Sequence, residues 1–391
     1  MTILSSRLTS FGGLAMALAL KVATSPAMAV KCGDTITNKT VLTADLICTC
    51  GDYSSALTVN GPATLDLNGH TVTCTPEDPY DTIVCLIVSG KGATIKNGIV
   101  SGCIYGINNP GAVIDSVLIK DIIAFDNRYD SIKLYGNNNR VLNVTIKATD
   151  TETENGGINL AGDNNQVKDC FLSKSIIFLS GNNITATSNI IEDTPNTCLY
   201  SDRGSVIKNN TFRRCGWNGV NVGATNSSIV GNKFYSVAGS SIYASDSFYA
   251  ESFTSTRIAG NRIYKSGFHG INFWAVRNVV VDSNVIVDSG ENGINFDPLT
   301  RRCTIKNNTI RKCGMSGLRI RGADANNFTN NKISFCTKGI NAGAGSARNR
   351  MINNRASNNT LFDLSDSSAN CGSNVWKGNT GKGNIACTQK K

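Results

Sequence analysis

The amino-acid sequence predicts an all-β protein built as a parallel β-helix, a solenoid in which each repeat forms one coil. The first observation is a column of asparagines spaced 21 to 29 residues apart, namely Asn189, Asn210, Asn232, Asn261, Asn284, Asn308, Asn331 and Asn354. A period in the low twenties is typical of stacked coils. The second is a recurring Gly-Ile-Asn segment, as at 270–272 and 293–295, followed by a polar turn and an apolar β-branched pair. Three short alternating strands per repeat favour a β-helix over a leucine-rich repeat, which would show a leucine framework and a helical segment.

The asparagines of the column have a structural interpretation. Asparagine tolerates the left-handed backbone region that a tight turn requires. Its side-chain amide can also bond the same amide in the coils above and below, which satisfies polar groups in the interior. We therefore predict an asparagine ladder that serves as scaffold.

The N-terminus has the pattern of a secretory signal peptide over residues 1–29. Arg7 precedes an apolar stretch, and Ala27-Met28-Ala29 is a small-x-small cleavage signal. The apolar stretch is well short of the ~20 residues that cross a membrane. We expect a secreted, extracellular protein, periplasmic in a bacterial host, with no membrane partner.

The mature chain divides into three parts, because a solenoid needs capped ends. Residues 30–55 are Cys-rich and precede the regular repeats, so we expect an N-terminal cap there. Residues 56–364 carry the repeats of the β-helix. Residues 365–391 are rich in Gly, Ser and Asn and are expected to form a C-terminal cap or tail.

All fourteen cysteines follow the predicted signal peptide. An even number in a secreted chain indicates several disulfides. Cys313 and Cys336 occupy the same repeat position, so stacked coils would hold their Cα atoms about 4.8 Å apart, inside the disulfide range. We expect a disulfide between them, with two unpaired buried thiols as the alternative. Cys371 and Cys387 are expected to tie down the tail.

The formal net charge is +10. A modest positive field suits an anionic polymer. Nucleic acid is not expected, because the chain is secreted and has no basic run with interleaved aromatics. An acidic, polyuronate-like polysaccharide is the expected partner; the alternative is a charge that only keeps the protein soluble. Eight Asn-x-Ser/Thr triplets, from Asn38 to Asn358, would make it a glycoprotein in a eukaryotic host.

A family resemblance rests on the Gly-Ile-Asn strands, the Asn-x-Ile turns and the segment Leu65-Asp66-Leu67-Asn68-Gly69-His70-Thr71. Over roughly residues 56–364 the chain resembles the right-handed parallel β-helix, pectin-lyase-like superfamily. The resemblance implies a single-stranded right-handed parallel β-helix, or β-solenoid, of about eleven or twelve coils. Members act mostly on polysaccharides, as lyases, hydrolases, esterases or epimerases, and others are adhesins.

One outer face can be read from the alternation within strands. The isoleucine of each Gly-Ile-Asn strand points inward, so the next residue and the one two further on point outward. Applied coil by coil, this rule gives Lys133, Tyr135, Asn159, Phe178, Tyr200, Asp202, Asn221, Tyr243, Ser245, Asn272, Trp274, Asn295, Asp297, Arg319 and Arg321. Exposed aromatic rings suit sugar rings, and arginine suits a uronate carboxylate.

Candidate catalytic residues on this face are Asp297, Arg319, His269 and Tyr243. Arginine would neutralise a uronate and stabilise an enolate-like transition state, while the other three could move the proton. Candidate substrate-binding residues are Trp274, Tyr200, Asp202, Asn272, Asn295 and Arg321. Two alternatives stay open: Asp297 forms a surface salt bridge with Arg319 or Arg321, and His269 is a turn histidine with satisfied hydrogen bonds.

A local resemblance involves the segment 293–298, which reads Gly-Ile-Asn-Phe-Asp-Pro. It is similar to the catalytic strand of alginate (mannuronan) C-5 epimerases, Tyr-Gly-Phe-Asp-Pro-His. Leu299 stands where the family has histidine, and Ile294 where it has tyrosine. Of that family's catalytic groups, only Asp297 carries over.

Other chemistry has little support in the sequence. There is no Gly-rich phosphate loop, no serine nucleophile elbow, no metal-ligand spacing and no carboxylate cluster of an inverting hydrolase. We expect no cofactor, no metal and a monomer. The predicted function is binding of an acidic polysaccharide, with lyase or epimerase modification as the favoured activity. The alternative is a non-catalytic surface, wall-associated or adhesive carbohydrate-binding protein.

Overall fold

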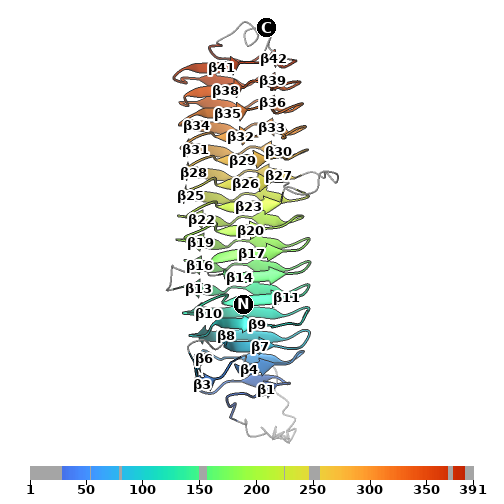
Figure 1. The fold of residues 1–391 in the computed structure, drawn as a ribbon, viewed down its shortest axis with the longest axis vertical. Coiled ribbons are helices and arrows are strands. Elements are labelled where there is room, and N and C mark those ends of the chain that lie inside the picture. Colours follow the sequence, from blue (N-terminus) through green and yellow to red (C-terminus); the bar gives the residue numbers. More distant parts are fainter. Residues whose placement is uncertain are drawn as a thin grey trace, which may run out of the picture.

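The computed structural model describes residues 29–52, 54–78, 82–148, 156–223, 225–245, 256–368 and 373–383. The predicted signal peptide, apart from residue 29, and the predicted Cys371–Cys387 pairing lie outside these residues. The described chain is a right-handed parallel β-helix, a column of stacked coils (Figure 1). No helix in the described ranges is long and apolar enough to cross a membrane.

Each coil contributes up to three short strands, and every strand pairs in parallel with its equivalent in the neighbouring coil. The first sheet holds fifteen strands, β1 (Thr35–Ile36), β4 (Ser55–Val59), β7 (Val84–Val88), β9 (Tyr105–Asn108), β11 (Ile132–Tyr135), β14 (Gly156–Ala161), β17 (Ile176–Ser180), β20 (Leu199–Ser201), β23 (Val220–Gly223), β26 (Ile242–Ser245), β29 (Ile271–Trp274), β32 (Ile294–Phe296), β35 (Ser316–Ile320), β38 (Lys338–Ala342) and β41 (Phe362–Asp366).

The second column holds β2 (Thr40–Val41), β5 (Thr64–Asp66), β8 (Thr94–Ser101), β10 (Leu118–Phe125), β12 (Arg140–Leu142), β15 (Gln166–Lys168), β18 (Thr185–Thr187), β21 (Val206–Lys208), β24 (Ser228–Val230), β27 (Arg257–Ala259), β30 (Val280–Asp282), β33 (Thr304–Lys306), β36 (Asn327–Thr329), β39 (Arg350–Ile352) and β42 (Val375–Lys377). The third column holds β3 (Leu46–Cys50), β6 (Thr71–Pro76), β13 (Thr145–Lys147), β16 (Phe171–Ser173), β19 (Ile190–Glu192), β22 (Thr211–Arg213), β25 (Lys233–Val237), β28 (Arg262–Ser266), β31 (Val285–Ser289), β34 (Thr309–Cys313), β37 (Lys332–Ser334) and β40 (Arg355–Ser357). The long strands β8 and β10 run through both columns.

The solenoid has about fourteen turns, so the predicted eleven or twelve coils are too few. Strand pairing begins with β1 on β4 and ends with β42 on β39. The paired strands therefore extend past both ends of residues 56–364, the range predicted for the repeats. These terminal strands are short and lack the Gly-Ile-Asn pattern. They pair because the edge of a parallel stack presents unpaired backbone N–H and C=O groups to any neighbouring extended segment.

Alternation within each strand produces one continuous apolar core. In β29 the side chains of Ile271 and Phe273 are fully buried, whereas Asn272 between them is partly exposed. Aromatic side chains stack from coil to coil, with the ring centroids of Phe212 and Phe234 4.9 Å apart. Each coil therefore adds one layer to a continuous apolar core, as expected of a solenoid.

The asparagine ladder is confirmed. Each side-chain N–H₂ donates to the side-chain oxygen of the next asparagine over 2.9–3.1 Å, from Asn189 to Asn354, and a last bond of 2.9 Å extends the ladder to Asn379. The side-chain oxygen of Asn284 also accepts the backbone N–H of Asn261.

The left-handed position of the turn differs from the prediction. It falls on the residue immediately before each ladder asparagine, as at Asn209, Ser283 and Asn307, where φ is +57°, +56° and +57°. Glycine takes the same position at Gly231 and Gly260. The reason is the direction of the side chain: the ladder residue must point inward to reach its neighbours, so the preceding residue makes the turn with its side chain in solvent.

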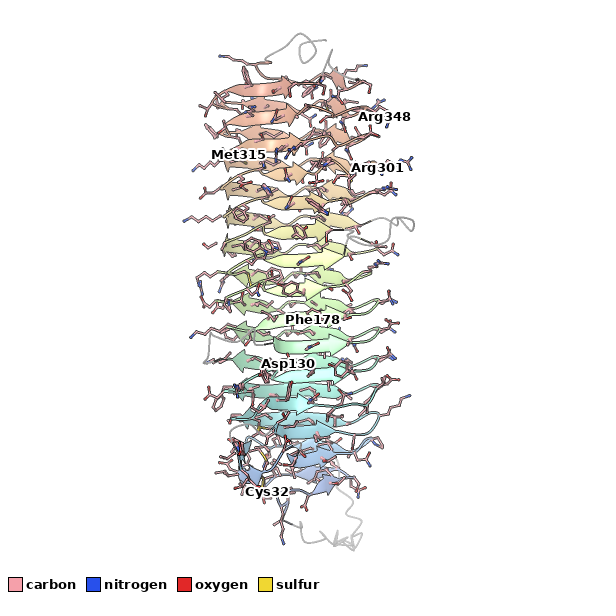
Figure 2. The ribbon with its side chains drawn as sticks, in the orientation of Figure 1. Cys32, Asp130, Phe178, Arg301, Met315 and Arg348 are labelled. Atoms are coloured by element: carbon pink, nitrogen blue, oxygen red, sulfur yellow. A yellow bond between two sulfur atoms is a disulfide. The ribbon has the colours of Figure 1, made fainter. Side chains whose placement is uncertain are left out.

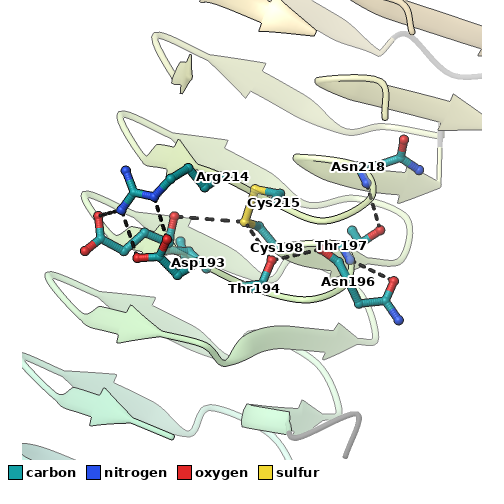
Figure 3. The surroundings of a disulfide bond; sticks show 10 residues. Asp193, Thr194, Asn196, Thr197, Cys198, Arg214, Cys215 and Asn218 are labelled. Atoms are coloured by element: carbon teal, nitrogen blue, oxygen red, sulfur yellow. Dashed lines mark hydrogen bonds and ion pairs between the residues drawn. A yellow bond between two sulfur atoms is a disulfide. The ribbon is translucent and has the colours of Figure 1, made fainter. Parts of the chain in front are cut away.

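Among the described residues four disulfides form, at Cα separations of 5.5–5.8 Å: Cys32–Cys48, Cys50–Cys74, Cys85–Cys103 and Cys198–Cys215. The Cys198–Cys215 bond and its surroundings are shown in Figure 3.

The predicted Cys313–Cys336 disulfide is wrong; both are buried free thiols, and the backbone N–H of Cys313 donates to the sulfur of Cys336 over 3.3 Å. Directly stacked residues have parallel Cα–Cβ bonds, which keep the Cβ atoms about one strand spacing apart, beyond the ~3.8 Å of a disulfide. Cys48 and Cys74 are also directly stacked, and each bonds to another cysteine instead.

Candidate functional site

The first sheet places the outward residues in one register line. Strand pairing aligns Lys133, Asn159, Phe178, Tyr200, Asn221, Tyr243, Asn272, Asn295 and Arg319 in successive coils. The alternation within each strand therefore brings residues more than 180 positions apart onto one face.

Three hollows lie along this face, and together they form what we call the groove. The first lies at the carboxyl-terminal ends of the strands, and the second and third lie at their amino-terminal ends. The first, of about 600 Å³, is lined among others by Phe178, Tyr200, Asp202, Arg203 and Asn221. The second, of about 450 Å³, is lined by Trp217, Asn218, Asn221, Ser240, Tyr243, Phe268, His269, Asn272 and Glu291. The third, of about 350 Å³, is lined by Glu291, Asn292, Gly314, Met315, Ser316, Arg319, Thr337, Lys338 and Asn341.

The hollows are contiguous because they share lining residues, Asn221 between the first and second and Glu291 between the second and third. Eight strands of the first sheet, from β17 to β38, lie beneath them. At about 4.8 Å per strand spacing the groove is on the order of 34 Å long. Figure 2 labels Phe178, which lines the first hollow, and Met315, which lines the third.

Two exposed aromatic side chains form the wall of the second hollow. Trp217 and Phe268 are 49% and 41% exposed, and their rings meet edge to face at 5.6 Å. Both lie in the turn before a first-sheet strand, outside the strand alternation from which the outer face was predicted. The signal was present: each stands in a Gly-aromatic-polar-Gly segment, at 216–219 and 267–270.

His269 connects the floor of the groove to the next coil. Its Nδ1 accepts the backbone N–H of Asn292 over 3.3 Å, and its Nε2 lies 3.5 Å from a carboxylate oxygen of Glu291. Nδ1 is therefore the acceptor, and the Nε2–H points at Glu291. Burial, assisted by the positive charge of Arg319, lowers the pKa of His269 to about 4. At neutral pH this histidine is uncharged and positioned by two partners, which matches the alternative of a satisfied turn histidine.

We expect nuclear magnetic resonance to give His269 a pKa of about 4 in the folded protein. The chain has two histidines, so a His70→Gln variant assigns the signals. The folded pKa lies below the unfolded value of about 6.5, so the unfolded state takes up a proton first as the pH falls. Stability is unaffected above pH 6.5 and falls by up to about 3 kcal/mol between pH 6.5 and 4. A His269 signal that titrates near pH 6.5 would contradict this assignment.

Asp297 lies beside the groove, just after β32. Burial raises its pKa, while the charges of Arg321 and Arg319 act in the opposite direction. Among the described residues it forms no ion pair, so the alternative of a surface salt bridge is not formed. Burial also raises the pKa of Tyr243, with a contribution from the negative charge of Asp297.

A chain of amides joins these residues across the coils. The guanidinium of Arg319 donates to the side-chain oxygen of Asn295 over 3.4 Å. The side-chain N–H₂ of Asn295 donates to Asn272 over 2.9 Å. Tyr243, Asn272, Asn295 and Arg319 are thus held on consecutive coils.

Other predicted site residues lie apart from this group. Tyr200 and Asp202 line the first hollow, where Asp202 accepts a hydrogen bond from Ser180 over 2.9 Å. Trp274 is 49% exposed at the end of β29 and is stacked on Ser245, which lines the first hollow. Asp297 and Arg321 follow β32 and β35 at this same edge of the strands, opposite the edge that holds the second and third hollows. His269 precedes β29 and Asp297 follows β32, so about five residues, roughly 16 Å, separate them along the strand direction.

Two family models match parts of the chain, each over less than half of it. The model described as "Right handed beta helix region" matches residues 218–386. The model described as "Periplasmic copper-binding protein (NosD)" matches residues 113–276. No curated protein matches the chain.

The solved structures that match the chain are distant in sequence. The A-module of the Azotobacter vinelandii mannuronan C-5 epimerase AlgE4 is 13% identical with a TM-score of 0.44, covering 88% of this chain and 86% of that one. The catalytic unit of a GH87 α-1,3-glucanase from Streptomyces thermodiastaticus is 13% identical with a TM-score of 0.46, covering 91% and 65%. The receptor binding domain of the siphovirus 9NA tailspike is 10% identical with a TM-score of 0.42, covering 91% and 75%.

Copper does not fit the donor groups of the matched segment. Within the described residues no group of three or more His, Cys, Asp or Glu side chains could hold a metal ion. The thiol of Cys170 is buried, and burial raises its pKa to about 12. His269 is already held by Glu291 and Asn292. We therefore derive no chemistry through copper.

Proposed function

We propose that this chain is a secreted, monomeric β-helix protein that binds an extended acidic polysaccharide along the groove. The observation that supports this is the contiguity of the three hollows, with Trp217 and Phe268 as an exposed wall. Exposed aromatic faces are costly to leave in water unless a partner covers them. A groove open at both ends and about 34 Å long suits a polymer.

The acidic character of the polymer follows from the cations around the third hollow. Arg319 and Lys338 line it, and Arg321 is exposed just after β35, at the opposite edge of the strands. None of the three forms an ion pair within the described residues, so their charges are available to a carboxylate. Four disulfides agree with an oxidising compartment outside the cytosol.

Binding is tested by calorimetric titration of the purified mature protein with alginate, pectate and neutral dextran. Alginate or pectate is expected to bind, with an affinity that weakens as salt is added, whereas dextran is expected to bind much more weakly. Equal affinity for dextran would remove the acidic polymer as the ligand, and no binding to any polysaccharide would remove the proposed function.

A second candidate is chemical modification of the bound uronate, and a specific observation favours it. Asp297 is a carboxylate with a raised pKa and no ion pair, electrostatically close to Tyr243 and Arg319. Asp297 would accept the proton on the carbon next to the uronate carboxylate, whose developing charge Arg319 would stabilise. Tyr243, protonated at neutral pH, would return a proton to the opposite face or protonate the leaving sugar oxygen.

Modification is tested on the same polymers by two readouts: absorbance of unsaturated uronates for a lyase, and proton exchange in NMR spectra for an epimerase. Activity is expected to be lost in Asp297→Ala and Arg319→Ala proteins that keep the wild-type fold. No change in any polyuronate, with binding intact, would leave the chain a non-catalytic binding protein.

A further inference from the structure

A second charged surface lies outside the groove, on the third strand column. We call it the basic strip and define it by the exposed cations of strands β25, β28, β34, β37 and β40: Lys233, Arg262, Lys265, Arg311, Lys312, Lys332 and Arg355. In Figure 1 the strands β25, β28, β31 and β34 run along one edge of the column, beside the first sheet. One exposed carboxylate, Asp288, lies among the seven cations.

The cations of the basic strip are unpaired. Within the described part of the chain none of the seven takes part in an ion pair, and the described side-chain contact is a cation–π contact of Arg311 over Phe335 at 5.9 Å. Charges that have no intramolecular partner are available to an external anion.

The same column shows how this protein neutralises such cations elsewhere. Arg213 at the end of β22 and Arg214 just after it form ion pairs with Glu192 and Asp193, which hold the equivalent positions at the end of β19 in the preceding coil. Figure 3 shows the pairing of Arg214 with Asp193 beside the Cys198–Cys215 disulfide. From β25 onward the two equivalent positions hold Tyr235 and Ser236, then Tyr264 and Lys265, Val287 and Asp288, and Arg311 and Lys312, so Asp288 is the carboxylate among them.

Like charges are stacked in register within the strip. Lys233 pairs directly with Arg262, and Lys332 with Arg355, on adjacent parallel strands. Like charges directly opposite one another on neighbouring strands are destabilising. A bound polyanion would remove this repulsion, so the arrangement is one that a ligand stabilises.

The shape of the strip indicates a chain-like ligand. Six strands, β25, β28, β31, β34, β37 and β40, span five spacings, on the order of 24 Å along the solenoid axis. The strands are only three to five residues long, so the surface is narrow across. Tyr235 and Tyr264 lie among the cations and are stacked on each other, with centroids 5.6 Å apart, and their partly exposed edges add apolar surface to the strip.

We propose that the basic strip is a second polysaccharide-binding site, separate from the groove, that takes a linear acidic polysaccharide along the solenoid axis. Carboxylate and sulfate groups both present anionic oxygens, which accept charge-assisted hydrogen bonds from lysine and arginine. The strip and the groove lie on different sheets, so each can bind a chain without the other.

The test is a fourfold variant, Lys233→Gln, Arg262→Gln, Lys332→Gln and Arg355→Gln, with Arg213→Gln and Arg214→Gln as the matched control. Binding to pectate and to dextran sulfate is measured at several salt concentrations. We expect the fourfold variant to lose about tenfold in affinity at low salt and to show a flatter salt dependence, because fewer counterions are released. The control, whose arginines are already paired, is expected to stay within about twofold.

Folding of the fourfold variant is checked by its thermal midpoint, which we expect to equal or exceed that of the wild type, because the stacked like charges are gone. If the wild type binds only one of the two polymers and the fourfold variant loses that binding, the strip is supported as the site. The polymer that binds then shows whether its ligand carries carboxylate or sulfate groups. Unchanged affinity and salt slope in a folded fourfold variant overturn it, as does capture by vesicles of anionic lipid without binding to either soluble polymer.

The two sites can fail separately. A Trp217→Ala, Phe268→Ala protein that loses all polyanion binding at low salt would place the whole interaction in the groove and overturn the strip. Loss in the fourfold variant, with none in that double variant, would support the strip and remove the groove as the polysaccharide site.

Discussion

Replacing Asn284 with alanine is expected to lower the free energy of unfolding by about 4 kcal/mol, because several buried polar groups lose their partners together. The Asn284 side chain donates to Asn308 over 3.0 Å and to the backbone carbonyl of Ile258 over 2.9 Å. Its oxygen accepts both the backbone N–H and the side-chain N–H₂ of Asn261 over 2.9 Å. Water cannot replace these contacts, since Asn284 is fully buried.

Urea unfolding and hydrogen exchange measure this loss. Exchange is needed because a solenoid can open locally, so that the coils around residue 284 lose protection before the rest. Asn307→Gly is the matched control: it alters the exposed asparagine before the ladder residue of the next coil, at a position where glycine fits the left-handed backbone. It removes one exposed hydrogen bond, to Asp282 over 3.1 Å, and should change stability by less than about 1 kcal/mol. A loss below 1 kcal/mol in the Asn284→Ala protein would show that the ladder is not a main source of stability.

Removing both aromatic walls, by Trp217→Ala with Phe268→Ala, is expected to weaken polysaccharide binding by about a hundredfold, or about 2.7 kcal/mol. These two rings are exposed and in contact with each other, so together they present a continuous apolar surface to the groove. Such aromatic anchors typically supply most of the binding energy, whereas the contacts around them contribute little.

Tyr129→Ala is the matched control for the groove, and affinity is measured by calorimetric titration with alginate or pectate. Tyr129 is 42% exposed and lies in an equivalent turn, on a coil before the groove begins, so its loss should change affinity by less than twofold. Trp274→Ala, on the far edge of the strands, should cost less than the double change. A larger loss from Trp274→Ala would move the binding face to the edge that holds Asp297.

The sequence predicted the register but not the shape of the groove. The asparagine spacing and the Gly-Ile-Asn strands place Tyr243, Asn272, Asn295 and Arg319 on one line, because a parallel stack keeps equivalent residues one strand spacing apart. Turns follow no such period, and the side chains of Trp217, Phe268 and Glu291 enter the groove from turns.

The incorrect predictions have a common physical cause. Spacing along the chain gives Cα positions, but the outcome at Cys313 and Cys336 depends on the direction of their Cα–Cβ bonds. The same is true of the ladder turn, where the inward direction of Asn210 forces the left-handed conformation onto Asn209. The number of coils was too low because terminal strands form by pairing with a free edge and need little pattern of their own.

The sequence by itself determined the solenoid, its asparagine ladder and the order of side chains along the outer face, since each depends on a repeat that neighbouring coils share. The tertiary structure alone decided which side chains meet across turns: the aromatic wall of the groove, the held and uncharged state of His269, the unpaired Asp297 and the unmatched cations of the basic strip. Those features depend on side-chain direction and on contacts between turns, and neither is periodic in the sequence.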